Sequence, residues 1–317
     1  MTVGVISHLH NPTTEEAAGL AAACEQAGAD WLGLPDAFWW RDVWVQLAAA
    51  AQATSSLRLG PVVTNPYLRH PFHTVAAIAT LQGIGGDRFF LGLAAGGSEV
   101  TGAARVSRED AGTRIDELAQ LVRSIAAGSP LDEASGRRLE VPLAPVPILV
   151  AGRGDGVLKA AGRVSDDALV WAVPMSDLER SVGVIEAAAA ARRHAPGARP
   201  RIMWAPLVVH DDTSASRIAT IAAYSVLNSS AALHKRWGLD ASVLAEIRST
   251  LVAGGAAAAR HLVPDAALDD LIITDSDPRS VAAIARGIGA TALAVPAFDI
   301  ASVPDRVAWA RSVLAAL

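Results

Sequence analysis

The chain has 317 residues, of which 51% are hydrophobic and 19% are charged, so it can bury a large core and is not intrinsically disordered. Its net charge is −5 and no basic stripe is present, so nucleic acid is not an expected partner. The single cysteine, Cys24, excludes an intramolecular disulfide. Without a signal-peptide pattern or an apolar run of about 18 residues, the sequence predicts a cytoplasmic protein that does not enter a membrane.

Strand and helix patterns alternate from one end of the chain to the other. Short apolar runs indicate strands, and capped or amphipathic stretches indicate helices. The first six predicted strands each precede a predicted helix: strand 3–8 and a helix from Thr13 or Thr14 to about Ala27, strand 30–36 and helix 42–53, strand 57–65 and helix 72–82, strand 88–96 and helix 107–127, strand 147–152 and helix 155–163, and strand 166–174 and helix 177–193. The seventh predicted strand is 201–210. The eighth is 290–298, and a helix at 304–316 follows it.

The eight strands are apolar throughout rather than alternating, which is typical of parallel strands that helices cover on the outside. Eight such units in a chain of this length favour a closed (β/α)8 TIM barrel over an open doubly wound sheet. We therefore predict one domain over 1–317, with a helical insertion at about 211–289 between the seventh and eighth strands. Long insertions of this kind usually build specificity at the carboxyl ends of the strands.

The third strand raises a question, because LGPVVTNPYLRHP (59–71) runs from an apolar strand straight into many polar groups. A turn needs only one or two such groups, whereas a binding site at the end of the strand uses more. In a barrel the other strand ends lie beside this one. They carry His8, Asp36, Trp39 and Trp40, AAGGSEV (94–100), AGRGDG (151–156), Trp171, Trp204 and Phe298.

Two of these strand ends are rich in glycine. AGRGDG precedes a helix, and its free backbone N–H groups together with Arg153 suit a phosphate, although a plain tight turn gives the same pattern. The glycines of AAGGSEV allow a ligand to approach the backbone closely. No metal-binding spacing, no G-x-S-x-G and no lysine at a strand end is present, so a bound cofactor is expected to supply the chemistry.

Four segments make the chain similar to a known family. They are 41–71, DRFFLGLAAGG (87–97), RIDELAQLVRSIAAG (114–128) and VPILVAGRGDGVLKAAGRVSDDALVW (146–171). The chain resembles the luciferase-like family of flavin- and deazaflavin-dependent oxidoreductases. Within that family it is most similar to the methylene-tetrahydromethanopterin reductase-like group, which uses coenzyme F420.

The resemblance implies a cofactor site. It implies a cis peptide bond at Val62–Val63, with Thr64 and Asn65 against the deazaflavin ring. It places Asp36 near the polar edge of the ring, and the remaining cofactor contacts at Gly96, Gly97, Ser98, Gly152, Arg153 and Gly154. The chain departs from the family at 165–167, where Ser-Asp-Asp replaces the usual Ala-Asp-Gly.

The leading hypothesis is thus an F420-dependent oxidoreductase that transfers a hydride between C5 of the deazaflavin and an unidentified small substrate. Catalytic candidates are His8, Asp36 and Trp40, and candidates for the substrate pocket are Trp39, Trp171 and Trp204. One alternative is an FMN-dependent monooxygenase supplied by a reductase partner, and another is a flavin-binding barrel without catalysis. The resemblance also implies a homodimer through helices of the second and third units, and the helix at 43–53 is apolar almost all round.

Overall fold

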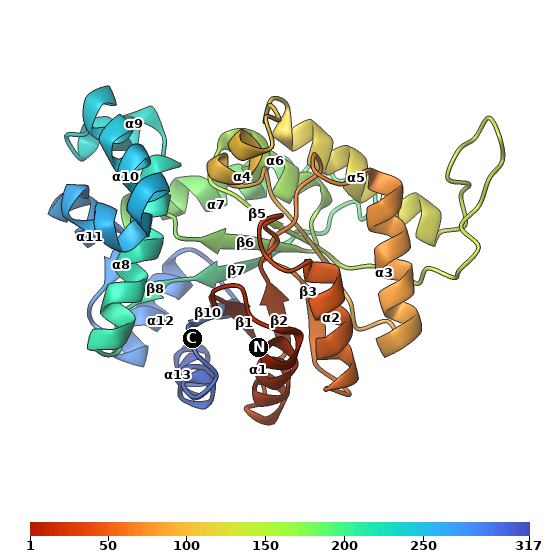
Figure 1. Ribbon diagram of the computed structural model, residues 1–317, viewed down its shortest axis with the longest axis horizontal. Helices are drawn as coiled ribbons and strands as arrows, with labels where there is room; N and C mark the ends of the chain where they lie inside the picture. The colour runs from red at the N-terminus through yellow and green to blue at the C-terminus, as the bar shows by residue number, and fades with distance from the viewer.

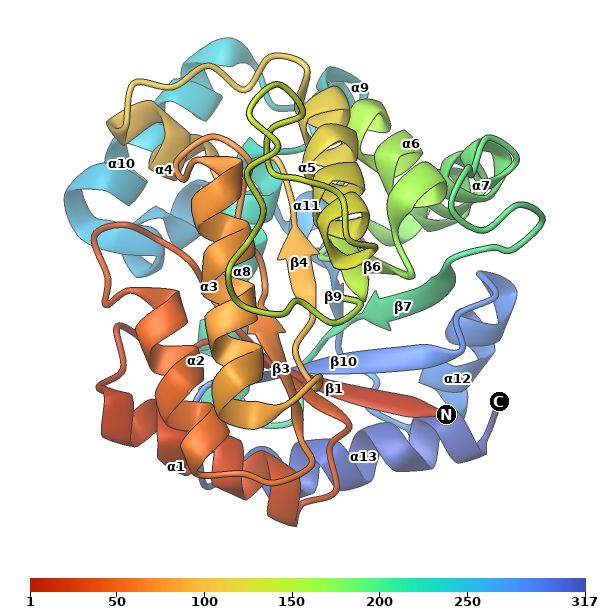
Figure 2. The same cartoon turned by 90° about the vertical axis from the view of Figure 1, so that its right-hand side faces the viewer.

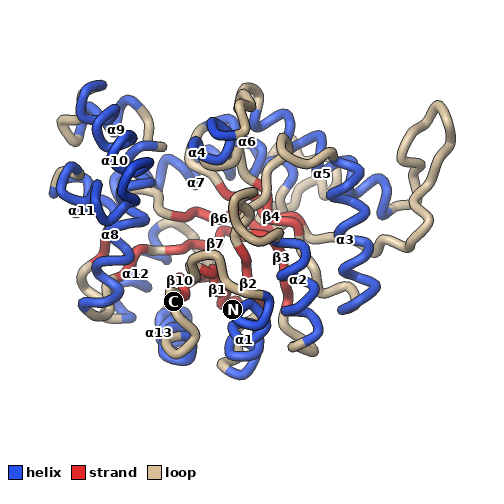
Figure 3. Tube along the Cα trace, in the orientation of Figure 1, coloured by secondary structure: helices blue, strands red, loops and turns tan.

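The computed structural model describes residues 1–317, apart from the side chains of residues 213 and 254–257. Eight parallel strands form the predicted barrel, in the order β3-β2-β1-β10-β7-β6-β5-β4 (Figure 1). Figure 3 shows these strands inside a layer of helices. The strands are β1 (Thr2–Ser7), β2 (Trp31–Leu34), β3 (Arg58–Pro61), β4 (Leu91–Leu93), β5 (Ile148–Ala151), β6 (Asp167–Trp171), β7 (Arg201–Ala205) and β10 (Ala292–Ala297).

The barrel closes between β3 and β4. Two backbone hydrogen bonds of 3.0 Å join these segments, one from Phe90 N–H to the Leu59 carbonyl and one from Thr64 N–H to the Gly92 carbonyl. Between Leu59 and Thr64 the peptide bond that joins Val62 to Val63 is cis, at the position that the resemblance implies. The regular part of this strand is therefore shorter than the predicted 57–65, and the chain from residue 62 onward belongs to the strand end.

Helices cover the outside of the barrel (Figure 2). They are α1 (Thr14–Gln26), α2 (Val43–Gln52), α3 (Pro71–Gly85), α5 (Ala111–Ala126), α6 (Asp155–Val164), α7 (Leu178–Ala189), α12 (Pro278–Gly287) and α13 (Val303–Ala315). Two short helices, α4 (Ser98–Ala103) and the 3-10 helix η1 (Met175–Asp177), belong to the segments that follow β4 and β6. Thr13 caps α1 by accepting a hydrogen bond from Glu16 N–H, as expected for a helix that begins there. The segment 97–106, which lies between the predicted strand 88–96 and the predicted helix 107–127, contains α4.

Side chains fill the interior of the barrel. Trp31 reaches across it and meets Phe90 edge-on, with the ring centroids 5.6 Å apart. A Cβ atom at position 4 would lie 1.9 Å from the Trp31 ring, so only Gly4 leaves room for that indole. The barrel interior is a packed core, and in this fold ligands bind at the carboxyl ends of the strands.

The predicted insertion is present, with different bounds. After Pro206 the chain forms β8 (Leu207–Val208), then α8 (Asp212–Leu227), α9 (Ala231–Arg236), α10 (Ala241–Ala259), η2 (Arg260–Leu262), α11 (Asp265–Leu271) and β9 (Ile272–Ile273), which pairs with β8. These helices stand at the left of the barrel in Figure 1. The predicted strand 201–210 is thus divided at Pro206. The final helix of the range 211–289, α12, packs against α13 in the outer layer of the barrel.

Two further features complete the fold. The segment 128–146 extends away from the barrel as a long loop at the right of Figure 1. Within the described part of the chain, every helix is too short or too polar to cross a membrane.

Candidate functional site

The candidate site lies at the barrel mouth, meaning the carboxyl ends of the eight strands and the loops that follow them. Asp36 follows β2, and its Oδ2 accepts a hydrogen bond of 2.6 Å from the Thr64 hydroxyl beyond β3. Burial raises the pKa of Asp36, and the hydrogen bond from Thr64 partly opposes this rise. Two of the predicted site residues are therefore in direct contact.

Asn65 lies beside Thr64 and is buried. Its Oδ1 accepts backbone hydrogen bonds of 3.1 Å from Tyr67 and Leu68, so part of the polar run after β3 holds the turn itself. The Asn65 amide nitrogen has no hydrogen-bond partner among the described side chains and backbone groups. That group remains available to a ligand.

His8 follows β1 and is enclosed by aromatic rings. Its ring centroid is 5.4 Å from that of Trp171 and 5.4 Å from that of Phe298. Burial lowers the pKa of His8 to about 4, so the imidazole is neutral at pH 7. Its Nε2 is buried, as is the hydroxyl of Ser7, and neither atom has a hydrogen-bond partner within the described structure.

Arg153 lies between β5 and α6 in the AGRGDG loop. Its guanidinium donates one hydrogen bond of 3.3 Å, to the Ala172 carbonyl, and it forms no ion pair with any carboxylate that the structure describes. Burial lowers the pKa of Arg153 to about 10, which still leaves the group charged at pH 7. Arg153 is partly buried. Removing part of a cation from water without an anionic partner is costly, and a bound anion would compensate for it.

The backbone around Arg153 also suits an anion. Gly154 is the residue before α6, and no side chain caps the free N–H groups of that helix. A Cβ at position 152 would lie 2.4 Å from a methyl group of Val157, so the close packing of this loop requires Gly152. This end of the site can hold a phosphate.

The loop after β4 lies next to Asn65. Gly96 has φ of 76°, a conformation that favours glycine, and a Cβ there would lie 3.3 Å from the Asn65 Cβ. Gly97 and Ser98 lead directly into α4, and Thr101 of that helix packs against Gly96. The loop therefore presents mainly backbone to the barrel mouth.

The predicted tryptophans are divided among three environments. Trp171 lies at the mouth against His8. Trp40 packs edge-on against His10, and Trp39 is 46% exposed and lies beside Phe38. Trp39 and Trp40 therefore lie at the rim of the barrel mouth. Trp204 was predicted to line the pocket, and this prediction is wrong. Its side chain is 2% exposed and packs in the core between the strands and the helices. Its neighbour Met203 points the other way and fills the barrel interior.

Two polar residues at the mouth were not among the predicted site residues. Glu99 lies in the first turn of α4, and Tyr224 lies on α8 of the insertion. Glu99 is within the AAGGSEV motif, so that motif could have suggested it. Tyr224 had no comparable signal, because its position depends on how the insertion packs on the barrel.

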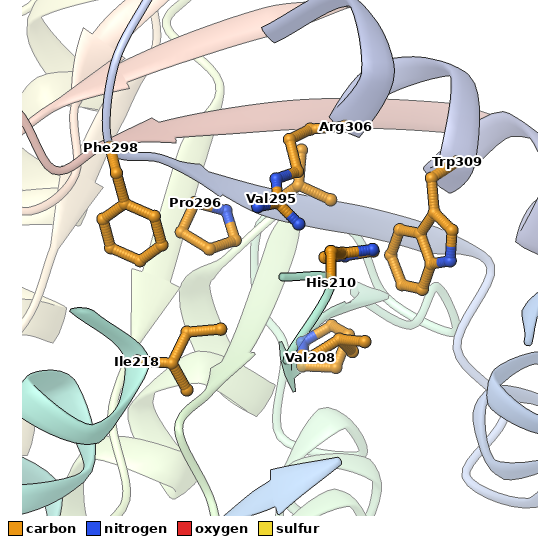
Figure 4. Close-up of a pocket in the computed structure, with 9 residues that line it drawn as sticks. Val208, His210, Ile218, Val295, Pro296, Phe298, Arg306 and Trp309 are labelled. Carbon is orange, nitrogen blue, oxygen red and sulfur yellow. The ribbon is translucent and has the colours of Figure 1, made fainter. Parts of the chain in front are cut away.

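A small cavity lies near the mouth but is not the substrate site. It has a volume of about 10 Å³ and is lined by β10, α13 and the start of the insertion. Figure 4 shows His210 and Trp309 on one side of it and Phe298 on the other. The volume suits one water molecule at most. Among the described side chains, no three histidine, cysteine, aspartate or glutamate residues are grouped to hold a metal ion.

Comparisons with known proteins identify similar sequences and a similar fold. The family model described as luciferase-like monooxygenase matches residues 1–289. The 5,10-methylenetetrahydromethanopterin reductase of Methanolobus tindarius is 29% identical over 242 residues, which are 74% of each chain. The F420-dependent hydroxymycolic acid dehydrogenase of Mycobacterium tuberculosis is 29% identical over 69% of this chain and 66% of its own. The solved structure of the coenzyme F420-dependent tetrahydromethanopterin reductase from Methanopyrus kandleri covers 96% of both chains with a TM-score of 0.78 at 22% identity.

Proposed function

Because the chain belongs to the luciferase-like monooxygenase family, we propose that it is an oxidoreductase that uses coenzyme F420. Hydride would pass between C5 of the deazaflavin and an electrophilic carbon of a small substrate. One relative named as an F420-dependent dehydrogenase and another named as a methylenetetrahydromethanopterin reductase support this proposal. The observation that carries a phosphate-bearing cofactor is Arg153, a partly buried guanidinium without an acidic partner in the described structure, beside the open N-terminus of α6.

The residues present fit this cofactor. Arg153 and the backbone of Gly152 and Gly154 would hold its phosphate, and Gly96 to Ser98 would lie along its tail. Val62, Val63, Thr64 and Asn65 would lie against the ring. The deazaflavin would supply the carbon that donates or accepts a hydride, and the protein would orient the two reactants.

Three residues are proposed to assist the chemistry, and a fourth to contact the substrate. Asp36, held by Thr64, would interact with the polar edge of the ring. His8 is neutral and presents an unpaired Nε2, so it would contact the substrate by a hydrogen bond rather than by charge. Trp40 would close the rim, and Trp171 would give the substrate an apolar surface beside His8.

FMN is the competing cofactor, and the description of the family as monooxygenases favours it. FMN also carries a phosphate, so Arg153 alone does not separate the two. As an FMN monooxygenase the protein would need a reductase partner to supply reduced flavin, and a partner that reduces F420 is equally compatible with the leading proposal. We also propose that the protein acts as a homodimer through α2 and α3.

A titration of the purified protein with F420 and with FMN tests the proposal, with cofactor fluorescence as the readout. Micromolar binding of F420 together with weak FMN binding supports it. Tight binding of FMN without F420 overturns it and favours the monooxygenase. Binding of neither overturns both. The Arg153→Met variant should lose affinity for the preferred cofactor, and the Arg193→Met variant, which changes an exposed arginine, should not.

A further inference from the structure

A basic segment follows β4 and borders the candidate cofactor site. Residues 105–114 contain three arginines, Arg105, Arg108 and Arg114, and two acidic side chains, Glu109 and Asp110. Arg114 pairs with Glu117 at 3.3 Å, whereas Arg105 and Arg108 form no ion pair with any carboxylate that the structure describes. The segment therefore carries positive charge that its own ion pairs do not neutralise.

Arg108 lies against the glycine loop that follows β4. Its Nη1 donates a hydrogen bond of 3.2 Å to the Gly96 carbonyl. This loop, from Gly96 to Ser98, is the one proposed to lie along the cofactor tail. The other N–H groups of Arg108 make no hydrogen bond to residues that the structure describes, so they are free to bind an anion held by this loop.

The same segment also contacts the AGRGDG loop. Gly112, in the first turn of α5, is buried, and a Cβ at that position would lie 2.4 Å from the Gly156 carbonyl in the first turn of α6. The two helices lie side by side (Figure 2). Because Arg153 precedes α6, Arg108 lies on the stretch of chain that connects the loop assigned to the cofactor tail with the loop assigned to its phosphate.

The surrounding structure fixes the path of this segment. Tyr67, which follows β3, donates a hydrogen bond of 3.1 Å from its hydroxyl to the Glu109 carbonyl. Arg105 and Asp110 have φ of 56° and 54°, in the left-handed region that residues other than glycine rarely adopt. Such conformations persist only where the surrounding structure enforces them. The guanidinium of Arg108 is therefore presented from a defined backbone.

We propose that Arg108 binds the carboxylate groups in the tail of F420 and so determines a preference for F420 over FMN. This inference rests on the proposed F420-dependent function. The tail of F420 continues beyond the phosphate and carries carboxylates, whereas FMN ends at its phosphate. Arg153 thus contacts the feature that both cofactors share, and Arg108 contacts the feature that F420 alone carries. A guanidinium suits this role because its N–H groups match the two oxygens of a carboxylate.

Fluorescence titrations of the purified protein with two deazaflavins test the proposal. One is F420, and the other is the deazaflavin 5′-phosphate, which has the same ring and phosphate but no tail. Because Arg108 is exposed, we expect F420 to bind about threefold more tightly at about 20 mM salt, and this preference to shrink at about 500 mM salt. Arg108→Gln should remove the preference, and Arg108→Lys should retain most of it. Arg137→Gln, the same change of charge in the exposed loop 128–146, should leave it intact.

The outcomes separate this inference from the proposed function. Equal binding of the two deazaflavins by the wild-type protein overturns the inference and leaves the proposed cofactor standing. Equal weakening of both ligands in Arg108→Gln also overturns it, because Arg108 would then only hold the glycine loop in place. If neither deazaflavin binds the wild-type protein, the proposed cofactor is overturned and the inference with it. Thermal unfolding of each variant verifies that a lost preference is not lost folding.

Discussion

Thr64 donates a hydrogen bond of 2.6 Å to Oδ2 of Asp36, which joins the ends of β3 and β2 at the barrel mouth. The bond is short because its acceptor is a carboxylate in a partly buried setting. It stabilises the charged form of Asp36 against the rise in pKa that burial causes. Burial is the larger of the two effects, and Thr64 opposes it in determining the pH range in which Asp36 carries its charge.

Replacing Thr64 by valine should raise the pKa of Asp36 further, because the hydrogen bond that favours the carboxylate is lost. A carboxyl group with a raised pKa stays protonated up to a higher pH. If F420 requires the carboxylate, its affinity in Thr64→Val will fall at a higher pH than in the wild type, and Asp36→Asn will remove this pH dependence. Fluorescence titrations at a series of pH values measure both effects.

A second threonine provides the control. Thr80 on α3 also donates through its hydroxyl, but only to the Ala76 carbonyl within its own helix. Thr80→Val should leave the pH dependence of F420 binding unchanged. The same pH dependence in Thr64→Val and the wild type would show that Asp36 does not govern cofactor binding.

Arg153 should contribute strongly to binding and little to folding. Arg153→Met removes a charge-assisted contact with the phosphate, so the affinity for F420 should fall about 100-fold. The thermal stability of the protein without cofactor should not fall, because the replaced guanidinium has no anionic partner within the described structure. Fluorescence titration and thermal unfolding measure the two quantities.

A deazaflavin that lacks the phosphate locates the effect. Arg153→Met and the wild type should bind it equally, since neither can form the phosphate contact. If the variant loses affinity for this ligand as well, Arg153 maintains the shape of the loop rather than recognising the phosphate.

The order of strands and helices could be predicted because each buried parallel strand is a continuous apolar run. That same property hides which side of a strand faces the barrel interior, since both sides are apolar. Met203 points inward and Trp204 outward, and the sequence RIMWA is compatible with either choice. The prediction for Trp204 failed for this reason.

Other differences arise from local and from distant causes. Pro206 lacks an N–H group, so it ends β7 within the predicted strand, a signal that was present in the sequence. Tyr224, from the insertion, packs against the same buried cluster as Trp171 of the barrel, so this contact joins residues far apart in the sequence. No local pattern predicts such a contact, whereas the resemblance to the family predicted the Val62–Val63 cis bond.

Glu25 should stabilise the fold from outside the site. Its Oε1 accepts backbone hydrogen bonds from Ser55, Ser56 and Leu57, at 3.0, 2.7 and 2.9 Å. These bonds lower the pKa of Glu25 to about 2, and the backbone bond from Ser56 has the largest effect. Glu25→Gln should reduce the free energy of unfolding by about 1–2 kcal/mol at pH 7, as measured in urea.

The pH dependence of this effect has a definite sign. Because the pKa is lower in the folded state, the contribution of Glu25 is complete above its ordinary value of 4.5 and is lost as the pH falls toward 2. The difference between Glu25→Gln and the wild type should therefore shrink below pH 4.5. Glu15→Gln, an exposed change on the same helix, should have little effect at any pH, and a difference for Glu25→Gln that grows in acid would contradict this account.

Exposed apolar side chains on and beside α2 and α3 should form the interface of a homodimer. Val45 is 59% exposed and Phe72 is 37% exposed, and Leu68 and Ile84 are also exposed on this side. Val45→Asp and Phe72→Asp would each bury a charge in such an interface, so each should convert the dimer to a monomer in analytical ultracentrifugation. Val252 on α10 is 74% exposed but lies in the insertion, and Val252→Asp should leave the dimer intact. If the wild-type protein is a monomer at micromolar concentration, the proposed dimer does not form. If Val252→Asp alone dissociates the dimer, the interface lies elsewhere than on α2 and α3.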